Sequence, residues 1–212
     1  MSPIIIGLAG GTASGKTELA RFLATQLRGS AVIISQDWYY RDRSMLSPGE
    51  RRMLNFDHPH AFDYGLLRKQ LAALKAGRSV RAPRYSYVTH RRSNSGTWLR
   101  FAKVILLEGL YVLHDPDLRA LLDYSVFVDV PADVRLMRRV RRDVVERGIG
   151  VAETLRLYEH CVRSMHDQFV QPSARYASVI WSQQTDHDFP RRLARRFMKL
   201  AGEKATSFSP GR

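Results

Sequence analysis

The sequence predicts a single α/β domain built on a mostly parallel sheet that is flanked by helices. Three observations support this prediction. The chain has 212 residues, a length that suits one such domain, and 44% of them are hydrophobic, as in globular proteins. In addition, short apolar segments alternate with segments of helical periodicity, which is typical of parallel strands joined by crossover helices.

The elements follow from the local pattern in chain order. Residues 3–9 are apolar and β-branched and run into glycines, so they are predicted to form a buried strand. Residues 17–27 carry apolar side chains at helical spacing and are predicted to form the next helix. Further buried strands are predicted at 31–35, 104–107, 124–130 and 178–181. Further helices are predicted from Pro131 to about Arg147, over 152–169, and from about Pro190.

Residues 36–102 interrupt this alternation. They are rich in aromatic residues, arginines and prolines, and we interpret them as an insertion that carries substrate contacts. The sequence has no repeat and no low-complexity linker, so residues 1–212 are predicted to form one domain. Residues 203–212 are predicted to be a loose tail.

Several classes of protein are excluded by composition. Cys161 is the only cysteine, which excludes an internal disulfide and a cysteine-held zinc cluster; we expect it to be a buried helix residue and not a nucleophile. His58 and His60 lack a third ligand at suitable spacing, so they are not predicted to bind a metal. No apolar stretch reaches the length of a membrane span, and no secretory signal is recognised. We therefore expect a cytoplasmic protein that does not bind membranes.

The charge balance is strongly basic. Lysine and arginine total 34 against 20 acidic residues, which gives a formal net charge of +14. Such a field attracts anions, but nucleic acid, lipid headgroups and nucleotide phosphates would all satisfy it. The arginine pairs at 191–192 and 195–196 favour a solvated helix face over a docking patch.

A phosphate-binding loop is the strongest signal in the chain. Residues 10–17 read GGTASGKT and match G-x-x-x-x-G-K-[ST], between a predicted strand and a predicted helix. Lys16 is predicted to reach the β- and γ-phosphates, and the Thr17 hydroxyl to ligate Mg²⁺. The rest of the loop would cradle the phosphates with its backbone: Gly10, Gly11, Thr12, Ala13, Ser14 and Gly15. A glycine-rich turn without a ligand is the alternative, and the strand–loop–helix context favours the phosphate loop.

Two acids stand at the ends of predicted strands. Asp37 follows the strand at 31–35, and Glu108 ends the strand at 104–107. The carboxyl ends of parallel strands line the ligand crevice of an open α/β sheet, so both acids should lie close to the phosphate loop. Either acid alone could be a helix cap or a turn residue. Together with the loop they predict a site for Mg²⁺ or its waters.

Several separate motifs, found in family order, resemble the uridine/cytidine kinase family. They extend over about residues 4–181 and comprise 10–17, 35–37 with Tyr40, 55–59 with 61–63, Pro83 and Tyr85 with His90, 108–109, and 138–148. The resemblance implies a P-loop NTPase-type fold and transfer of the γ-phosphate of ATP or GTP to the 5′-hydroxyl of uridine or cytidine, as in nucleotide salvage. It also suggests a homo-oligomer, and no nucleic-acid partner is expected.

For the acceptor, the resemblance implies that Asp37 accepts the proton of the 5′-hydroxyl and that Asp57 holds the ribose hydroxyls. Tyr40 would help to form the wall of the nucleoside pocket. The pyrimidine would be contacted or flanked by three side chains: Tyr85, His90 and Tyr87. These roles suit the side chains, because a carboxylate can accept hydrogen bonds from two vicinal hydroxyls and an aromatic face can stack on a base.

For the phosphates, the resemblance implies that Arg139 approaches the substrate, with Arg142 and Arg147 nearer the transferred group. Asp186 would contact the nucleotide. Mg²⁺ would be surrounded by Thr17, Asp37 and Glu108.

The arginine-rich segment 133–150 is interpreted as a lid. At helical spacing one face carries Arg135, Arg138, Arg139 and Arg142. Guanidinium groups that close over a transferring phosphoryl group stabilise its charge and help to exclude water. A solvated basic helix or a nucleic-acid contact is the alternative interpretation.

Two residues depart from the family pattern. Ile149 stands where the family usually has an arginine, and Leu157 stands in place of a glutamine. Both changes remove a hydrogen-bonding side chain, and such losses alter substrate discrimination strongly. The preferred nucleoside therefore stays open. Two other hypotheses are a kinase of a pantothenate- or phosphoribulose-like compound and a basic nucleic-acid-binding protein that uses the loop as a nucleotide sensor.

Overall fold

The computed structural model describes residues 2–52, 54–87, 89–93 and 95–202. The tail predicted at 203–212 lies outside the described residues. A five-stranded sheet forms the centre of the molecule, and its neighbouring strands are all parallel. The strands in spatial order are β2 (Ala31–Ser35), β7 (Val104–Glu108), β1 (Ile4–Gly10), β8 (Tyr124–Asp129) and β9 (Val179–Ser182). The predicted fold class is confirmed.

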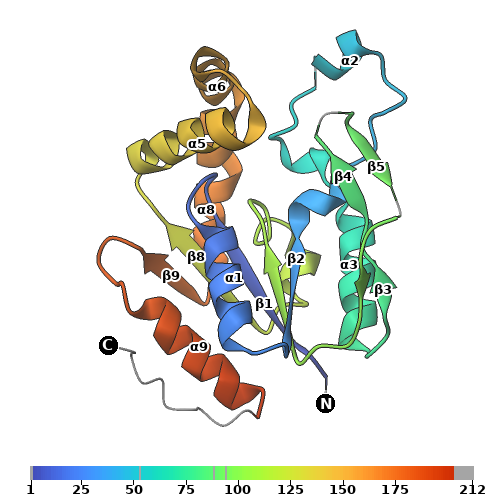
Figure 1. Ribbon diagram of the computed structural model, residues 1–212, viewed down its shortest axis with the longest axis vertical. Coiled ribbons are helices and arrows are strands. Elements are labelled where there is room, and N and C mark those ends of the chain that lie inside the picture. The colour runs from blue at the N-terminus through green and yellow to red at the C-terminus, as the bar shows by residue number, and fades with distance from the viewer. Residues whose placement is uncertain (1, 53, 88, 94, 203–212) are drawn as a thin grey trace.

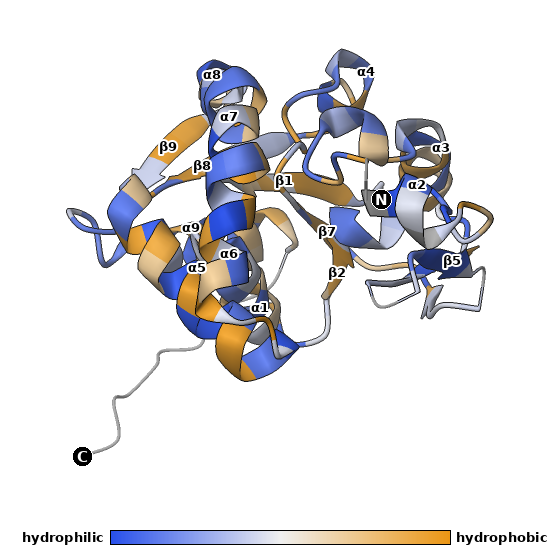
Figure 2. Cartoon of the chain, turned by 90° about the horizontal axis from the view of Figure 1, so that it is seen from above, coloured by the Kyte–Doolittle hydropathy of each residue, from blue (hydrophilic) through white to orange (hydrophobic). Residues whose placement is uncertain are grey.

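Helices cover the two faces of the sheet (Figures 1 and 2), and an apolar core lies on each face. On one face, α1 (Lys16–Gln26) and α9 (Phe189–Leu200) pack against Ile6 and Leu8 of β1. On the other face, α3 (Tyr64–Lys75) and α4 (Pro116–Arg119) pack against Ile5 and its neighbours. Successive β1 side chains point to opposite faces, which explains why the whole strand is apolar.

One predicted strand has a different environment from the one expected. β2 is at the edge of the sheet and is mostly half-buried, whereas the sequence predicted a buried strand. An apolar run of five residues does not reveal how many neighbours a strand has, because strand order is set by the crossovers. The edge position still leaves Asp37 at the carboxyl end of the sheet, where the sequence placed it.

The segment 36–102, which was interpreted from the sequence as an insertion, contains several short elements and one longer helix. It contains η1 (Gln36–Tyr39), α2 (Pro48–Arg52), η2 (Pro59–Ala61), and the antiparallel pairs β3 (Val80–Arg81) with β6 (Trp98–Leu99) and β4 (Arg84–Ser86) with β5 (Arg91–Ser93). It also contains α3, which the sequence analysis missed. The carboxylate of Asp63 caps this helix by accepting from the Leu66 amide, and Leu67, Leu71 and Leu74 are buried in the core. Their spacing of three and four residues was the signal.

The helical region after the fourth strand is longer than predicted. α5 (Ala132–Arg147) ends at Gly148, as expected, with a left-handed φ of 67°. A helical run then extends through α6 (Val151–Leu157), η3 (Tyr158–Val162), α7 (Arg163–Met165), η4 (His166–Val170), α8 (Gln171–Ser173) and η5 (Ala174–Tyr176), beyond the predicted end at 169. Pro172 does not stop it, because a proline is tolerated in the first turn of a segment such as α8.

Two smaller expectations can be compared with the structure. Cys161 lies in the π-helical turn η3 and is half-buried, not buried as predicted; burial raises the pKa of its thiol. The arginines of α9 are exposed, in agreement with a solvated face. Among the described residues, no helix is both long enough and apolar enough to cross a bilayer.

Candidate active site

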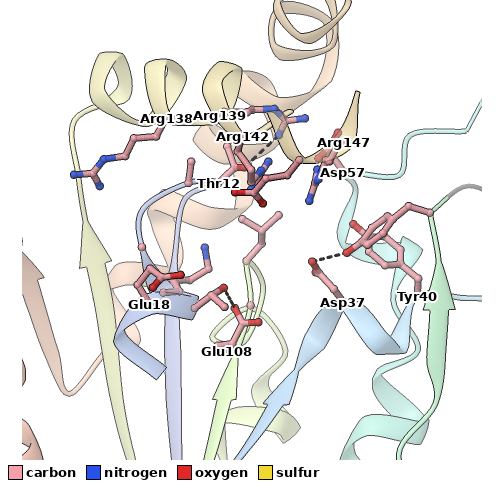
Figure 3. A pocket seen from close by; sticks show the side chains of 18 of the residues that line it. Thr12, Glu18, Asp37, Tyr40, Asp57, Glu108, Arg138, Arg139, Arg142 and Arg147 are labelled. Atoms are coloured by element: carbon pink, nitrogen blue, oxygen red, sulfur yellow. Dashed lines mark hydrogen bonds between the residues drawn. The ribbon is translucent and has the colours of Figure 1, made fainter. Parts of the chain in front are cut away.

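A cavity of about 520 Å³ lies at the carboxyl ends of the strands. The phosphate loop, Asp37, Glu108 and α5 line different sides of it (Figure 3). Figure 3 shows the acids rising from the strand ends below and the arginines entering from the helix above. The cavity therefore combines most of the residues that the sequence analysis selected.

The phosphate loop has the backbone that its glycines permit. Gly10 has a φ of 146°, and a Cβ there would lie 2.5 Å from the carbonyl oxygen of Val128. Gly15 has a φ of 88° and precedes α1. The buried Lys16 ammonium donates to the Gly11 carbonyl at 2.7 Å. Burial lowers the pKa of Lys16 to about 8, against the opposing charges of Glu108 and Asp37.

Oxygen ligands converge beside the loop. The Thr17 hydroxyl donates to Glu108 Oε2 at 3.3 Å, and Asp37 lines the same cavity. Burial raises the pKa of Glu108, and the charge of Asp37 adds to this while Lys16 opposes it. Mg²⁺ prefers oxygen ligands and usually takes one or two carboxylates from the protein, with water and phosphate completing its shell. The donor set of Thr17, Glu108 and Asp37 fits that requirement.

The acceptor side contains Asp57 and an aromatic cluster. Asp57 lines the cavity, and burial raises the pKa of its carboxyl although the charge of Arg139 opposes the shift. Tyr40 and Tyr87 also line the cavity. The Tyr87 hydroxyl donates to Asp37 Oδ2 at 2.7 Å, a contact that the sequence analysis did not foresee.

Tyr85 and His90 lie behind this wall and do not line the cavity. The Tyr85 ring stacks on Tyr40 with centroids 4.9 Å apart, and the Tyr85 hydroxyl hydrogen-bonds His90 Nδ1 at 3.1 Å. The His90 ring stacks in turn on Phe56, at 4.4 Å between centroids. The contact of these two residues with a pyrimidine stays a prediction.

Four arginines of α5 line the cavity, and three of them pair with one buried acid. The Asp143 side chain is 1% exposed and pairs with Arg139 at 3.3 Å, Arg142 at 2.9 Å and Arg147 at 3.3 Å. Arg139 also donates to the Thr12 hydroxyl at 3.2 Å, which ties α5 to the phosphate loop. The sequence analysis gave Asp143 no role, although its spacing of four residues from Arg139 and Arg147 was visible.

Arg135 differs from its neighbours. It was predicted to share their face, but it is buried outside the cavity and its Nε donates to the Val130 carbonyl at 2.9 Å. Its guanidinium packs on the phosphate loop, because a Cβ on Gly11 would lie 2.6 Å from Arg135 Nη1. Arg135 therefore supports the loop from behind.

Of the residues that follow β9, Gln183 lines the cavity and the predicted nucleotide contact, Asp186, does not. Gln183 lines the cavity, donates to the Ser14 carbonyl at 2.7 Å and accepts from Arg138 at 2.9 Å. Asp186 does not line the cavity, and its carboxylate pairs with Arg192. The strand-end rule that selected Asp37 would also have selected Gln183. A nucleotide contact by Asp186 stays a prediction.

The backbone around Ile149 closes α5, since its amide donates to the Asp143 carbonyl at 2.9 Å. Ile149 and Leu157 are both half-buried and do not line the cavity. His58 has one ring nitrogen engaged, because its Nδ1 accepts from the His60 amide at 3.1 Å.

Comparison with known proteins identifies a family and several relatives of this chain. Residues 5–190 match the model of the phosphoribulokinase/uridine kinase family. The chain is 47% identical over 179 residues to a uridine kinase of Halalkalibacterium halodurans, covering 84% of this chain and 85% of the relative. It is 44% identical over 180 residues to a uridine kinase of Brevibacillus brevis, covering 84% of both. A phosphoribulokinase structure from Rhodobacter spheroides superposes with a TM-score of 0.62 over 85% of this chain and 70% of that one, at 15% identity, which indicates a shared fold.

Proposed function

The chain belongs to the phosphoribulokinase/uridine kinase family, and from this premise we propose that it phosphorylates the 5′-hydroxyl of uridine, and of cytidine, with ATP as the donor. The observation that carries the proposal is one cavity that joins the phosphate loop to Asp37 and Asp57, in a chain 47% identical to a uridine kinase. A nucleoside triphosphate is the donor that the family implies.

The donor phosphates would bind at the phosphate loop. Backbone amides of the loop and the positive end of α1 favour phosphate oxygens, and the Lys16 ammonium can leave the Gly11 carbonyl for them. Mg²⁺ would be held by Thr17 and Glu108 with Asp37 nearby, and when bound it would neutralise charge on the phosphates.

The acceptor would lie between Asp37 and Asp57. Asp57 would accept hydrogen bonds from the two ribose hydroxyls and so orient the 5′-carbon toward Asp37. Asp37 would take the proton of the 5′-hydroxyl as the oxygen of that hydroxyl bonds to the γ-phosphorus. The bond from the γ-phosphorus to the β-phosphate oxygen breaks in the same transfer, which releases the nucleoside diphosphate and the nucleoside monophosphate.

The arginines of α5 would stabilise the transferred group. Arg142 and Arg147 line the cavity opposite the phosphate loop, so their guanidinium groups can bind the equatorial oxygens of the phosphoryl group. Arg139 lies nearer the acceptor, since it interacts with Asp57 and the Thr12 hydroxyl. We propose that segment 133–150 acts as a lid on this basis.

The rival hypotheses receive less support. A pantothenate- or phosphoribulose-like acceptor has no ring or vicinal furanose hydroxyls to use the aromatic wall and Asp57. A nucleic-acid-binding role would leave unused the arrangement of Asp37, Asp57 and the four arginines around one cavity.

The proposal is tested by measuring ADP formation with uridine, cytidine, purine nucleosides, pantothenate and ribulose 5-phosphate as acceptors. We expect uridine or cytidine to give the highest rate. Asp37→Asn should lower kcat by about 10²- to 10⁴-fold, the usual contribution of a general base, while calorimetry still detects ATP binding.

Asp188→Asn is the matched control, because this acid pairs with Arg191 on α9 and does not line the cavity. It should have the wild-type rate. A faster rate with a non-nucleoside acceptor would contradict the choice of substrate, and an unchanged rate in Asp37→Asn would contradict its role as the base.

A further inference from the structure

Asp37, the carboxylate that we propose as the base, already accepts a hydrogen bond from a hydroxyl of the protein. The Tyr87 hydroxyl donates to Asp37 Oδ2 at 2.7 Å, and a dashed line at Asp37 in Figure 3 marks this bond. Tyr87 follows β4 of the segment 36–102, whereas Asp37 follows β2 of the sheet. The contact therefore connects two parts of the chain that meet only through folding.

A phenol on a carboxylate resembles the arrangement that the reaction needs. The acceptor must also bring a hydroxyl to Asp37 within hydrogen-bond distance, because only then can its proton be transferred. The O···O distance of 2.7 Å is ideal for a hydroxyl donor, so Tyr87 forms a full hydrogen bond to Oδ2 of the carboxylate. An incoming hydroxyl that approaches Oδ2 would compete with the Tyr87 hydroxyl for this oxygen.

The Tyr87 hydroxyl stays protonated throughout the neutral range. Burial raises the pKa of Tyr87, and the charge of Asp37 and the hydrogen bond to it raise the pKa further. Hence the phenol is a hydrogen-bond donor at every pH at which the enzyme would work.

The Tyr87 side chain is only partly covered by other residues. It is 50% exposed, and its ring is held by edge contacts with Tyr40 and Tyr85 and by the guanidinium of Arg147, whose Cζ lies 5.4 Å from the ring centroid. A ring turned away from Asp37 would also change its contact with Arg147. Release of the base and repositioning of one lid arginine are thus linked through one side chain.

We propose that Tyr87 discriminates between acceptors by occupying Asp37 until a bound nucleoside displaces it. This proposal rests on the proposed function, in which Asp37 is the base. A nucleoside held by Asp57 can displace the phenol because its own hydroxyl is delivered by the rest of the bound molecule. Water has no such anchor, so it would displace the phenol from Oδ2 less readily, and hydrolysis of the triphosphate between turnovers would be slower.

Tyr87→Phe tests the proposal, because it keeps the ring and removes only the hydroxyl. We expect uridine-independent ATP hydrolysis to rise about tenfold, and KM for uridine to fall about tenfold, as one charge-assisted hydrogen bond no longer has to be broken. The change in KM should exceed the change in kcat, since the hydrogen bond that is removed is absent from the proposed reactive complex. Calorimetric binding of uridine without ATP should tighten by the same factor as KM.

Tyr124→Phe is the control. Tyr124 begins β8, which lies between β1 and β9 in the sheet, and it packs on Phe197 and does not line the cavity, so removal of its hydroxyl should alter none of the four measurements.

A fall in kcat with an unchanged KM would overturn the proposal, because Tyr87 would then orient the base within the reactive complex. Unchanged hydrolysis and unchanged uridine binding would overturn it as well. A wild-type protein without uridine-dependent ADP formation would overturn the proposed function itself. These outcomes are distinct, since the last is read from the wild type and the others from the variant.

Discussion

His166 is half-buried, in a place that does not favour a positive charge. Burial and the charge of Arg135 lower the pKa of His166 to about 4, although Asp167 and a hydrogen bond with Gln171 oppose the shift. Its Nδ1 has no hydrogen-bond partner among the described residues. The sequence analysis did not select this histidine, because nothing in its local sequence indicates burial beside an arginine.

This environment predicts a pH dependence of stability. Above about pH 6.5 His166 is neutral in the folded and unfolded states, so it has no effect on the pH dependence. Between pH 6.5 and 4 only the unfolded chain binds the proton, so the free energy of unfolding should fall as the pH falls. We expect a loss on the order of 1–2 kcal/mol after allowance for partial exposure, measured by urea unfolding across this range.

His166→Gln should reduce this loss, because glutamine does not titrate. The exposed His187 is the matched control, and His187→Gln should retain the wild-type dependence. Equal slopes in wild type and His166→Gln would show that other groups cause the acid instability.

At the scale of elements, a buried acid of α5, Asp143, orients the arginines of the same helix. Asp143 lies four residues from both Arg139 and Arg147, so all three side chains share one face of the helix. Three guanidinium groups around one buried carboxylate offset the cost of burying it, and they fix the direction in which the arginines point. We infer that Asp143 is a positioning residue for the lid.

Asp143→Asn should therefore impair both stability and catalysis. Removing the charge leaves the buried Arg139 without its ionic partner, a loss of about 3 kcal/mol in the free energy of unfolding. We expect kcat/KM to fall about 10- to 100-fold, mostly through kcat, because the arginines act on the transferred group. Thermal unfolding and steady-state kinetics measure the two effects.

Asp143→Glu should recover part of the kcat lost in Asp143→Asn, since it restores a carboxylate. If Asp143 had only a structural role, restoring the charge would not restore kcat. Glu153→Gln is the control, because it breaks an exposed pair with Arg156 on α6. A variant Asp143→Asn with normal kcat would contradict the positioning role.

At the scale of the whole molecule, the cavity lies between two groups of elements. In Figure 1, α5 and α6 stand on one side of the upper end of the sheet, and α2, β4 and β5 stand on the other. The proposed acceptor site lies on the side of α2, β4 and β5. The arginines that we propose to bind the transferred phosphoryl group lie on α5. Closure would bring them together only when both ligands fill the space between them.

Hydrogen exchange can detect this closure. We expect amide protection over α5 and α6 to increase strongly with uridine and a non-hydrolysable ATP analogue together, and only weakly with either ligand alone. Protection of β1 should stay constant, as it is buried at the centre of the sheet in every state. Full protection with the ATP analogue alone would contradict a lid that depends on the acceptor.

The basic residues behind the net charge of +14 are not confined to the cavity. Four arginines enter the cavity from α5, and four others project from α9 into solvent: Arg191, Arg192, Arg195 and Arg196. The charge excess therefore has a source in the site and another outside it. The homo-oligomer and the absence of nucleic-acid binding stay predictions.

The sequence by itself determined the fold class, the phosphate loop and the two strand-end acids. These depend on local properties: apolar periodicity defines strands and helices, glycines and Lys16 occur at fixed spacing, and parallel strands deliver Asp37 and Glu108 to the same edge. The resemblance added Asp57 and the arginines of α5 to this set.

Only the tertiary structure decided how these parts engage one another. The edge position of β2, the support of the loop by Arg135 and Gln183, and the bond from Tyr87 to Asp37 join residues that are distant along the chain. Such contacts arise from how helices and hairpins pack on the sheet, and no local pattern encodes the distance between two side chains on separate elements. For this reason the family resemblance implied only that Tyr87 flanks the pyrimidine, while the folded chain also holds its hydroxyl on the carboxylate of Asp37.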